Sequence, residues 1–148
     1  MSLKSILAAK SGDVICIKPT ADLAAAAKLL STHRIGVLVV LDADCRIVGI
    51  LSERDIVRAM AESGGTFLQV PVAQVMTRNV STCDVNDSTN TAIDLMTRGK
   101  FRHMPVLDKG RLVGMVSIGD VLKWHMETIR EHLRQLETSL VEFELIRL

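Results

Sequence analysis

The sequence of 148 residues contains no tyrosine, and aromatic residues make up only 3% of it. Proteins that bind single-stranded nucleic acids stack the bases on aromatic side chains, so this scarcity argues against that class. The formal net charge is +1, from 18 Lys and Arg against 17 Asp and Glu, whereas domains that bind DNA or RNA usually carry a basic excess on one face. We therefore expect no nucleic-acid partner.

Long apolar runs and paired cysteines are absent as well. The longest unbroken apolar stretches, such as Val37–Leu41, have five residues, whereas a membrane-spanning helix needs about 20. The N-terminus lacks the apolar segment of a secretory signal peptide. Cys16, Cys45 and Cys83 are odd in number and lack Cys-x-x-Cys spacing, which argues against a disulfide framework or a zinc site. We expect a soluble, cytoplasmic protein with no membrane partner and no bound metal.

What the sequence does contain is an internal repeat. Residues 39–42 match residues 105–108 at a shift of 66 (105 − 39), and after a one-residue deletion in a turn Val48-Gly49 matches Val113-Gly114 at a shift of 65 (113 − 48). Each copy predicts the element order β-α-β-β-α. The first copy predicts strands at 14–17, 37–41 and 47–51 and helices at 23–33 and from 52 to about 60. The second copy predicts strands at 80–82, 104–107 and 112–116 and helices at 88–98 and from 117 onward.

The repeat predicts an α/β fold of the α+β type. Because one copy alone would bury little core, the two copies should pack face to face about a pseudo-twofold axis. We assign residues 1–66 to the first repeat with an N-terminal lead-in at 3–9, and residues 67–124 to the second repeat with its own lead-in at 70–76. A long C-terminal amphipathic helix takes residues 125–148, and the connection at 62–66 is expected to be mobile.

One motif occurs in both copies: Gly49-Ile50-Leu51-Ser52-Glu53-Arg54-Asp55 and Gly114-Met115-Val116-Ser117-Ile118-Gly119-Asp120. A Ser followed three residues later by an acid is typical of a helix start, where the two residues cap each other's backbone. The same arrangement suits a ligand, because a helix N-terminus attracts phosphate and an acidic side chain accepts hydrogen bonds from a ribose diol. Both interpretations remain open at this point.

With this motif in each copy, residues 1–125 resemble a tandem pair of CBS domains, also called a Bateman module, of the stand-alone bacterial type. The resemblance implies a cleft between the repeats that holds an adenosine ligand such as AMP, ADP, ATP, NAD or S-adenosylmethionine. It also implies that the motif Asp contacts the ribose and the motif Ser the phosphate. Ser117 and Asp120 would then belong to one site, and Ser52 and Asp55 to the other.

The two sites are expected to be unequal. Arg102 and His103 stand where the family often has a basic residue, and their counterparts in the first copy are uncharged. We therefore expect the Ser117 site to bind anions more strongly, with help from residues 17–21, while Arg54 partly compensates at the Ser52 site. The candidate ligand-binding residues are Ile17, Lys18, Ala21, Ser52, Arg54, Asp55, Lys100, Arg102, His103, Pro105, Ser117, Gly119 and Asp120.

Two of these positions also fit a structural role. The string Arg98-Gly99-Lys100 is typical of a helix C-terminus with Gly at the C′ position and cations in the last turn. His103 fits a structural histidine as well as it fits a ligand contact.

The C-terminal segment has a heptad pattern. Apolar residues recur at spacings of 4 and 3, at Leu122, Met126, Ile129, Leu133, Leu136, Leu140 and Phe143. This spacing is typical of a coiled-coil seam, and we expect the helix to form a homodimer through it. The alternative is a helix that folds back on its own repeats.

These observations predict a regulatory module that binds an adenosine nucleotide, has no catalytic activity and no obligatory cofactor, and acts on a protein partner in trans. The alternative is an assembly protein that works through its C-terminal helix, with one or both nucleotide clefts vestigial. An enzyme is not expected, because the sequence has no Gly-x-Ser-x-Gly, no His-Glu-x-x-His, no P-loop and no glycine-rich dinucleotide turn.

Overall fold

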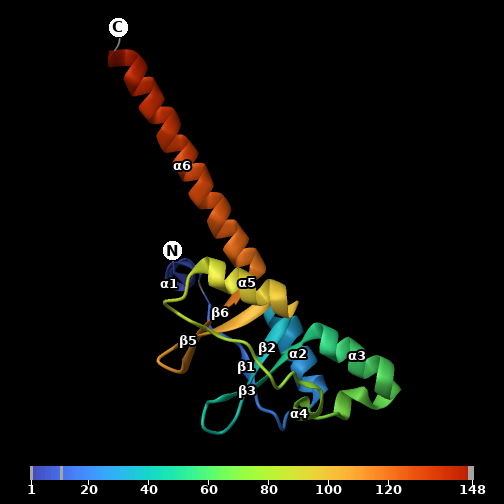
Figure 1. The fold of residues 1–148 in the computed structure, drawn as a ribbon. Coiled ribbons are helices and arrows are strands. Elements are labelled where there is room, and N and C mark those ends of the chain that lie inside the picture. Colours follow the sequence, from blue (N-terminus) through green and yellow to red (C-terminus); the bar gives the residue numbers. More distant parts are fainter. Residues whose placement is uncertain (1, 11, 147–148) are drawn as a thin grey trace.

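The computed structural model describes residues 2–10 and 12–146 and contains two three-stranded sheets, one from each repeat (Figure 1). In the first sheet β1 (Cys16–Ile17) runs parallel to β2 (Val37–Leu41), which pairs antiparallel with β3 (Ile47–Ser52). The repeat is completed by two helices, α2 (Leu23–His33) between β1 and β2 and α3 (Glu53–Ser63) after β3.

The second repeat has the same topology. β4 (Cys83–Asp84) is parallel to β5 (His103–Asp108), and β5 is antiparallel to β6 (Arg111–Ser117). The helix α5 (Thr89–Gly99) connects β4 to β5, and α6 (Ile118–Ile146) follows β6. The predicted α+β architecture of two β-α-β-β-α repeats with a long C-terminal helix is therefore confirmed.

Side-chain caps set where the helices begin. The carboxylate of Asp22 accepts a hydrogen bond from Ala25 N at 2.9 Å, and Ser88 Oγ accepts one from Thr91 N at 3.1 Å. Each cap satisfies a backbone N–H that the first turn of a helix leaves without a partner. The predicted helix at 23–33 has the bounds observed for α2, and the helix predicted at 88–98 is shifted by one residue because Ser88 is its N-cap.

The first strand of each repeat is shorter than the sequence predicts. β1 begins at Cys16 instead of residue 14, and β4 begins at Cys83, beyond the predicted range of 80–82. The residues expected to start these strands, Val14 and Val80, line cavities instead of pairing with a neighbouring strand. The valines at these positions therefore line a cavity. A short run of apolar β-branched residues is typical of a strand, so the sequence pattern does not distinguish the two roles.

The lead-in segments pack on opposite repeats. The helix α1 (Leu3–Ala9) contributes Leu3 and Ile6 to the core of the second repeat, and α4 (Val72–Val75) contributes Val72 to the core of the first. A Cβ on Gly114 would lie 2.6 Å from Leu7 Cδ2, so the missing side chain at Gly114 permits the close approach of α1 to β6. The sequence groups the N-terminal lead-in with residues 1–66 because the two are contiguous, whereas the structure packs it on the other repeat.

The connection between the repeats is ordered into helical turns. The helix α3 continues to Ser63, and the short 3₁₀ helix η1 (Gly64–Gln69) follows it, with Phe67 packed against the first core. Residues 62–66 therefore form the end of α3 and the start of η1, and their expected mobility stays a prediction.

The helix α6 projects away from both repeats as a single rod (Figure 1). Its first turns contact α5, β6 and α1, and every side chain described from Ile129 onward is exposed. The alternative of a helix folded back on its own repeats is therefore wrong for this structure. None of the helices in the described ranges is long and apolar enough to cross a membrane.

Candidate functional site: two crossed cavities

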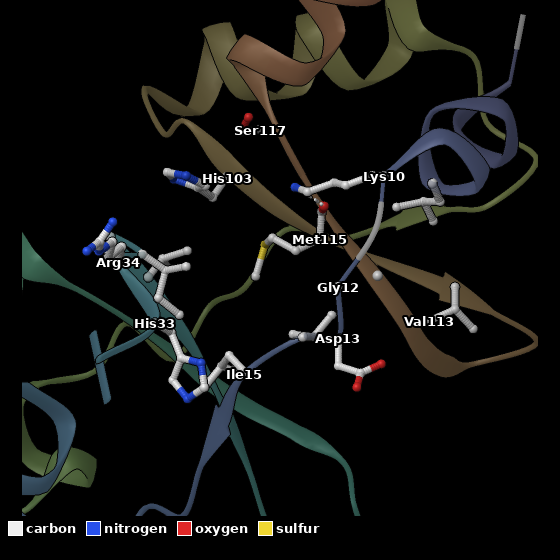
Figure 2. Close-up of a pocket in the computed structure, with 16 residues that line it drawn as sticks. Lys10, Gly12, Asp13, Ile15, His33, Arg34, His103, Val113, Met115 and Ser117 are labelled. Atoms are coloured by element: carbon white, nitrogen blue, oxygen red, sulfur yellow. Dashed lines mark hydrogen bonds between the residues drawn. The ribbon is translucent and has the colours of Figure 1, made fainter. Parts of the chain in front are cut away.

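Two cavities of about 540 Å³ each lie between the repeats. We call the first the Ser117 cavity; Figure 2 shows the residues that line it, which are Leu7, Lys10, Gly12, Asp13, Val14, Ile15, His33, Arg34, Ile35, Gly36, Val37, His103, Val113, Gly114, Met115 and Ser117. We call the second the Ser52 cavity; it is lined by Gly36, Val37, Ile50, Ser52, Glu53, Arg54, Asp55, Thr77, Asn79, Val80, Ser81, Gly99, Lys100, Phe101, Arg102 and His103.

Each cavity combines the motif of one repeat with a cationic helix cap of the other. Arg34 ends α2 with φ = 52°, and Lys100 ends α5 with φ = 56°, at equivalent positions of the two repeats. Arg34 lines the Ser117 cavity and Lys100 lines the Ser52 cavity. The residue at the left-handed cap position of α5 is thus Lys100, whereas the sequence predicts Gly99, which is instead the last helical residue.

At both motifs the Ser and Asp side chains cap a helix. In the first repeat Asp55 Oδ2 accepts hydrogen bonds from Ser52 N at 2.8 Å and Ser52 Oγ at 2.9 Å, and Asp55 N donates to Ser52 Oγ at 3.3 Å. In the second, Ser117 N donates to Asp120 Oδ2 at 2.9 Å, and Asp120 N donates to Ser117 Oγ at 3.1 Å. The capping interpretation is therefore correct for both copies, and the caps hold the motif side chains beside the cavities.

A lysine from the lead-in contacts the motif of the second repeat. Lys10 Nζ lies 2.7 Å from Asp120 Oδ2 and donates to the carbonyl oxygen of Met115 at 3.1 Å. Burial alone would raise the pKa of Asp120, but hydrogen bonds from Lys10 and Ser117 outweigh it and hold this pKa below its ordinary value. Lys10 is not among the residues expected from the sequence, because its lead-in was grouped with the first repeat.

His103 lies at the boundary and lines both cavities, as do Gly36 and Val37. Burial lowers the pKa of His103, the positive charge of Lys10 lowers it further, and the acids Asp120 and Glu53 only partly oppose the shift. The imidazole is therefore predominantly neutral at pH 7, since the ordinary pKa of histidine is already about 6.5.

The structure regroups the predicted cations. Lys100 and Arg102 line the cavity of Ser52 and Asp55, whereas the sequence assigned Arg102 to the site of Ser117. The backbone of Arg102 stays with its own repeat, since Ile118 N donates to its carbonyl oxygen at 2.9 Å. The segment between α5 and β5 thus runs along the boundary and lines the cavity that contains the motif of the other repeat, which a comparison of the copies within the sequence does not reveal.

Six of the predicted residues line neither cavity. Ile17 is buried in the first core, Pro105 is buried in β5, and the others lie in a turn or at the start of α6: Lys18, Ala21, Gly119 and Asp120. Asp120 is held beside the Ser117 cavity by its hydrogen bonds with Ser117. The expected place of these residues is taken by the residues just before β1 and β4. These are Asp13, Val14 and Ile15 in one cavity and Asn79, Val80 and Ser81 in the other, which the shift of 66 already aligns.

The sequence matches the family model of the CBS domain twice, at residues 4–62 and 72–127. These two matches cover the motifs, both sheets and both lead-ins. The chain belongs to the CBS domain family.

Solved CBS proteins share the arrangement. A CBS-domain-containing protein from Agrobacterium tumefaciens is 44% identical, with a TM-score of 0.79 over 82% of this chain and 91% of that one. A CBS domain protein from Pyrobaculum aerophilum, solved with AMP, is 29% identical, with a TM-score of 0.73 over 81% and 89%. A CBS domain pair solved with 5′-methylthioadenosine and S-adenosyl-L-methionine is 27% identical, with a TM-score of 0.76 over 86% and 98%.

Some curated relatives are longer than the matched region. An uncharacterised 17.7 kDa protein from Acidianus ambivalens is 38% identical over 111 residues, which make up 74% of this chain and 66% of that protein.

The charges that line the two CBS cavities differ. The Ser52 cavity has three permanent cations, Arg54, Lys100 and Arg102, beside the acids Glu53 and Asp55. The Ser117 cavity has Lys10 and Arg34 beside Asp13, and its Lys10 is already bonded to Asp120. The Ser117 cavity is therefore left with one cation that is not bonded to Asp120, Arg34, whereas the Ser52 cavity has three cations.

Proposed function

We propose that this CBS pair is a non-catalytic regulatory module that binds an adenosine nucleotide, such as AMP, ATP or an NAD-like ligand, in the Ser52 cavity. The proposal is carried by the cations Arg54, Lys100 and Arg102, which line the same cavity as the N-terminus of α3. The AMP, 5′-methylthioadenosine and S-adenosyl-L-methionine in the solved relatives support an adenosine ligand.

Each part of a nucleotide has a matching chemical group in this cavity. Arginine offers paired N–H donors to phosphate oxygens, and the positive end of the α3 dipole adds to the attraction. The carboxylate of Asp55, which also accepts the Ser52 hydrogen bonds, suits the ribose hydroxyls. The apolar side chains of Val37, Ile50 and Val80 suit the faces of an adenine ring.

The Ser117 cavity is proposed as the weaker site. A ribose that bonds to Asp120 there must displace Lys10 from the same carboxylate, and this competition lowers affinity. This ranking reverses the one expected from the sequence, because Arg102 and Lys100 line the other cavity.

A ligand in either cavity contacts both repeats, so it stabilises one relative arrangement of them over others. We propose that this change is the regulatory output and that a protein partner in trans responds to it. No step of covalent chemistry is required.

Thermal shift and calorimetry with AMP, ATP, NAD, S-adenosylmethionine and phosphate-free adenosine test the proposal. A ligand at 100 times its Kd should add about 2.7 kcal/mol of stability. Arg102→Ala should weaken binding of the phosphate-bearing ligand by about ten- to hundredfold, since a hydrogen bond to a charged group contributes about 1.5–3 kcal/mol, and should leave adenosine binding unchanged.

The matched control is Arg46→Ala, which removes an exposed arginine in the turn between β2 and β3. It should bind the nucleotide as the unmodified protein does. The absence of a shift with every nucleotide would refute the proposed function, and equal losses for Arg46→Ala and Arg102→Ala would refute the assignment of the cavity.

A further inference from the structure

The outer part of α6 is a helix without support from its own chain. All side chains described from Ile129 to Ile146 are exposed, and Figure 1 shows this part as an isolated rod. Most of the stability of helices in proteins comes from packing of an apolar face against a neighbouring surface. A partner surface that covers apolar side chains of this rod would therefore stabilise it.

One face of this rod is apolar along its whole length. Leu133 is 55% exposed, Leu136 61% and Phe143 72%, and together with Leu122, Met126, Ile129 and Leu140 they form the stripe of seven residues predicted from the sequence. Their alternating spacings of 4 and 3 place Met126, Leu133 and Leu140 at heptad position a, and the other four at position d.

The charges beside the stripe indicate how two such helices pair. Position e carries Lys123 and Arg130 in the first half of the helix and Glu137 in the second. Position g carries no permanent charge: His125, His132 and Ser139 occupy it. In coiled coils these two positions flank the seam and determine the partner and its orientation.

An antiparallel pair brings position e of one helix against position e of the other. Arg130 then faces Glu137 of the partner subunit, and the twofold axis repeats this ion pair. A parallel pair would instead place Arg130 opposite the partner's His125 and Glu137 opposite the partner's His132, without an oppositely charged pair of permanent ions. The charge pattern is therefore complementary to itself only when one copy is reversed.

We propose that α6 forms an antiparallel two-stranded coiled coil with α6 of a second copy of this chain. The register that pairs Arg130 with the partner's Glu137 also aligns the apolar layers. Leu133 packs against the partner's Leu136, Ile129 against the partner's Leu140, and Met126 against the partner's Phe143. The seam from Met126 to Phe143 is about 26 Å long at 1.5 Å per residue.

The antiparallel seam places the two CBS pairs at opposite ends of one rod. Their cavities then face separate partners instead of forming one joint surface. This inference does not rest on nucleotide binding, so the two proposals succeed or fail separately.

Sedimentation equilibrium of the full chain tests the pairing through charge reversal. Arg130→Glu alone and Glu137→Arg alone should each raise the dimer dissociation constant by several-fold to about tenfold, because each replaces two attractive pairs with two repulsive ones. The double variant Arg130→Glu/Glu137→Arg should restore the dissociation constant of the unmodified chain. The control Arg134→Glu makes the same charge change at position b, away from the seam, and should leave the dissociation constant unchanged.

A second variant tests the apolar seam. Leu133→Glu should give a monomer, and the unchanged thermal unfolding of the CBS pair would show that the repeats remain folded. A monomeric unmodified chain, a dimer that survives Leu133→Glu, or a double charge variant that fails to recover dimerisation would each overturn the proposal.

Discussion

Lys10 Nζ lies 2.7 Å from Asp120 Oδ2, so a lysine at the start of the chain neutralises the motif carboxylate of the second repeat. The motif carboxylate of the first repeat, Asp55, has a cation of its own helix beside it instead, since Arg58 Nη1 lies 3.6 Å from Asp55 Oδ1. The two motifs are alike in their caps but differ in what competes with a ligand for the carboxylate.

Replacement of Lys10 by Met removes the cation that is bonded to the carboxylate of Asp120. Lys10→Met should tighten adenosine binding in the Ser117 cavity by up to about fivefold, because a partly exposed ion pair contributes at most about 1 kcal/mol. Calorimetric titration measures the change, and Lys4→Met on the exposed face of α1 is the matched control. Weaker binding by Lys10→Met would show that Lys10 contacts the ligand.

The two motif acids should differ in importance for nucleotide binding. Asp55→Asn keeps an oxygen that can cap α3 but removes the charge that faces the ribose, and should weaken binding by about ten- to hundredfold. Asp120→Asn should have a smaller effect, because Lys10 already occupies that carboxylate. Nucleotide titrations of both variants check the ranking, which the reverse order of affinities would contradict.

Stability should depend on pH through His103. Its pKa is lowered in the folded state by burial and by Lys10, so the unfolded chain binds more protons as the pH falls below about 6.5. The folded protein should therefore lose stability as the pH falls from 7.5 through 6.5 to the lowered pKa of His103.

Unfolding temperatures between pH 5 and pH 7.5 measure this dependence. His103→Gln should flatten the curve in this range, and His33→Gln, which changes an exposed histidine at the end of α2, should leave it as it is. An unaltered slope in His103→Gln would show that another group is responsible.

The exchange of lead-ins predicts that α1 stabilises the second repeat. Leu3 has 0% exposure and lies in that core, so Leu3→Ala should lower the free energy of unfolding by about 2–5 kcal/mol. Chemical denaturation measures the loss, and Lys4→Ala on the exposed side of the same helix is the control. A loss below about 1 kcal/mol for Leu3→Ala would contradict the packing.

Much of the fold could be predicted from local patterns. The apolar spacing of α2 and the Asp22 cap lie within one segment, and the bounds of that helix were predicted to the residue. Both Ser-Asp caps are interactions over three residues, so they too are encoded locally. The starts of β1 and β4 could not be predicted, because a strand is defined by its partner strand and the partner lies elsewhere in the chain.

The candidate site could be predicted only in part. The motif residues Ser52, Asp55 and Ser117 were found because the repeat aligns them with each other. The presence of Arg102 and Ser52 in one cavity, and the contact of Lys10 with Asp120, could not be found in the same way, since each joins residues from different parts of the chain. An internal repeat shows which positions are equivalent but carries no information on which copy each side chain faces.

The sequence by itself determined the two β-α-β-β-α copies, their caps and the heptad stripe of α6, because these depend on residues within a few turns of one another. Only the tertiary structure decided that α1 packs on the second repeat and that each cavity joins one repeat's motif to the other repeat's cation. The physical reason is that the two lead-ins cross. Leu3 of the first lead-in is buried in the core of the second repeat, and Val72 of the second lead-in is buried in the core of the first. That crossing brings Lys10 to Asp120 and adds the charge of Lys10 to the Ser117 cavity.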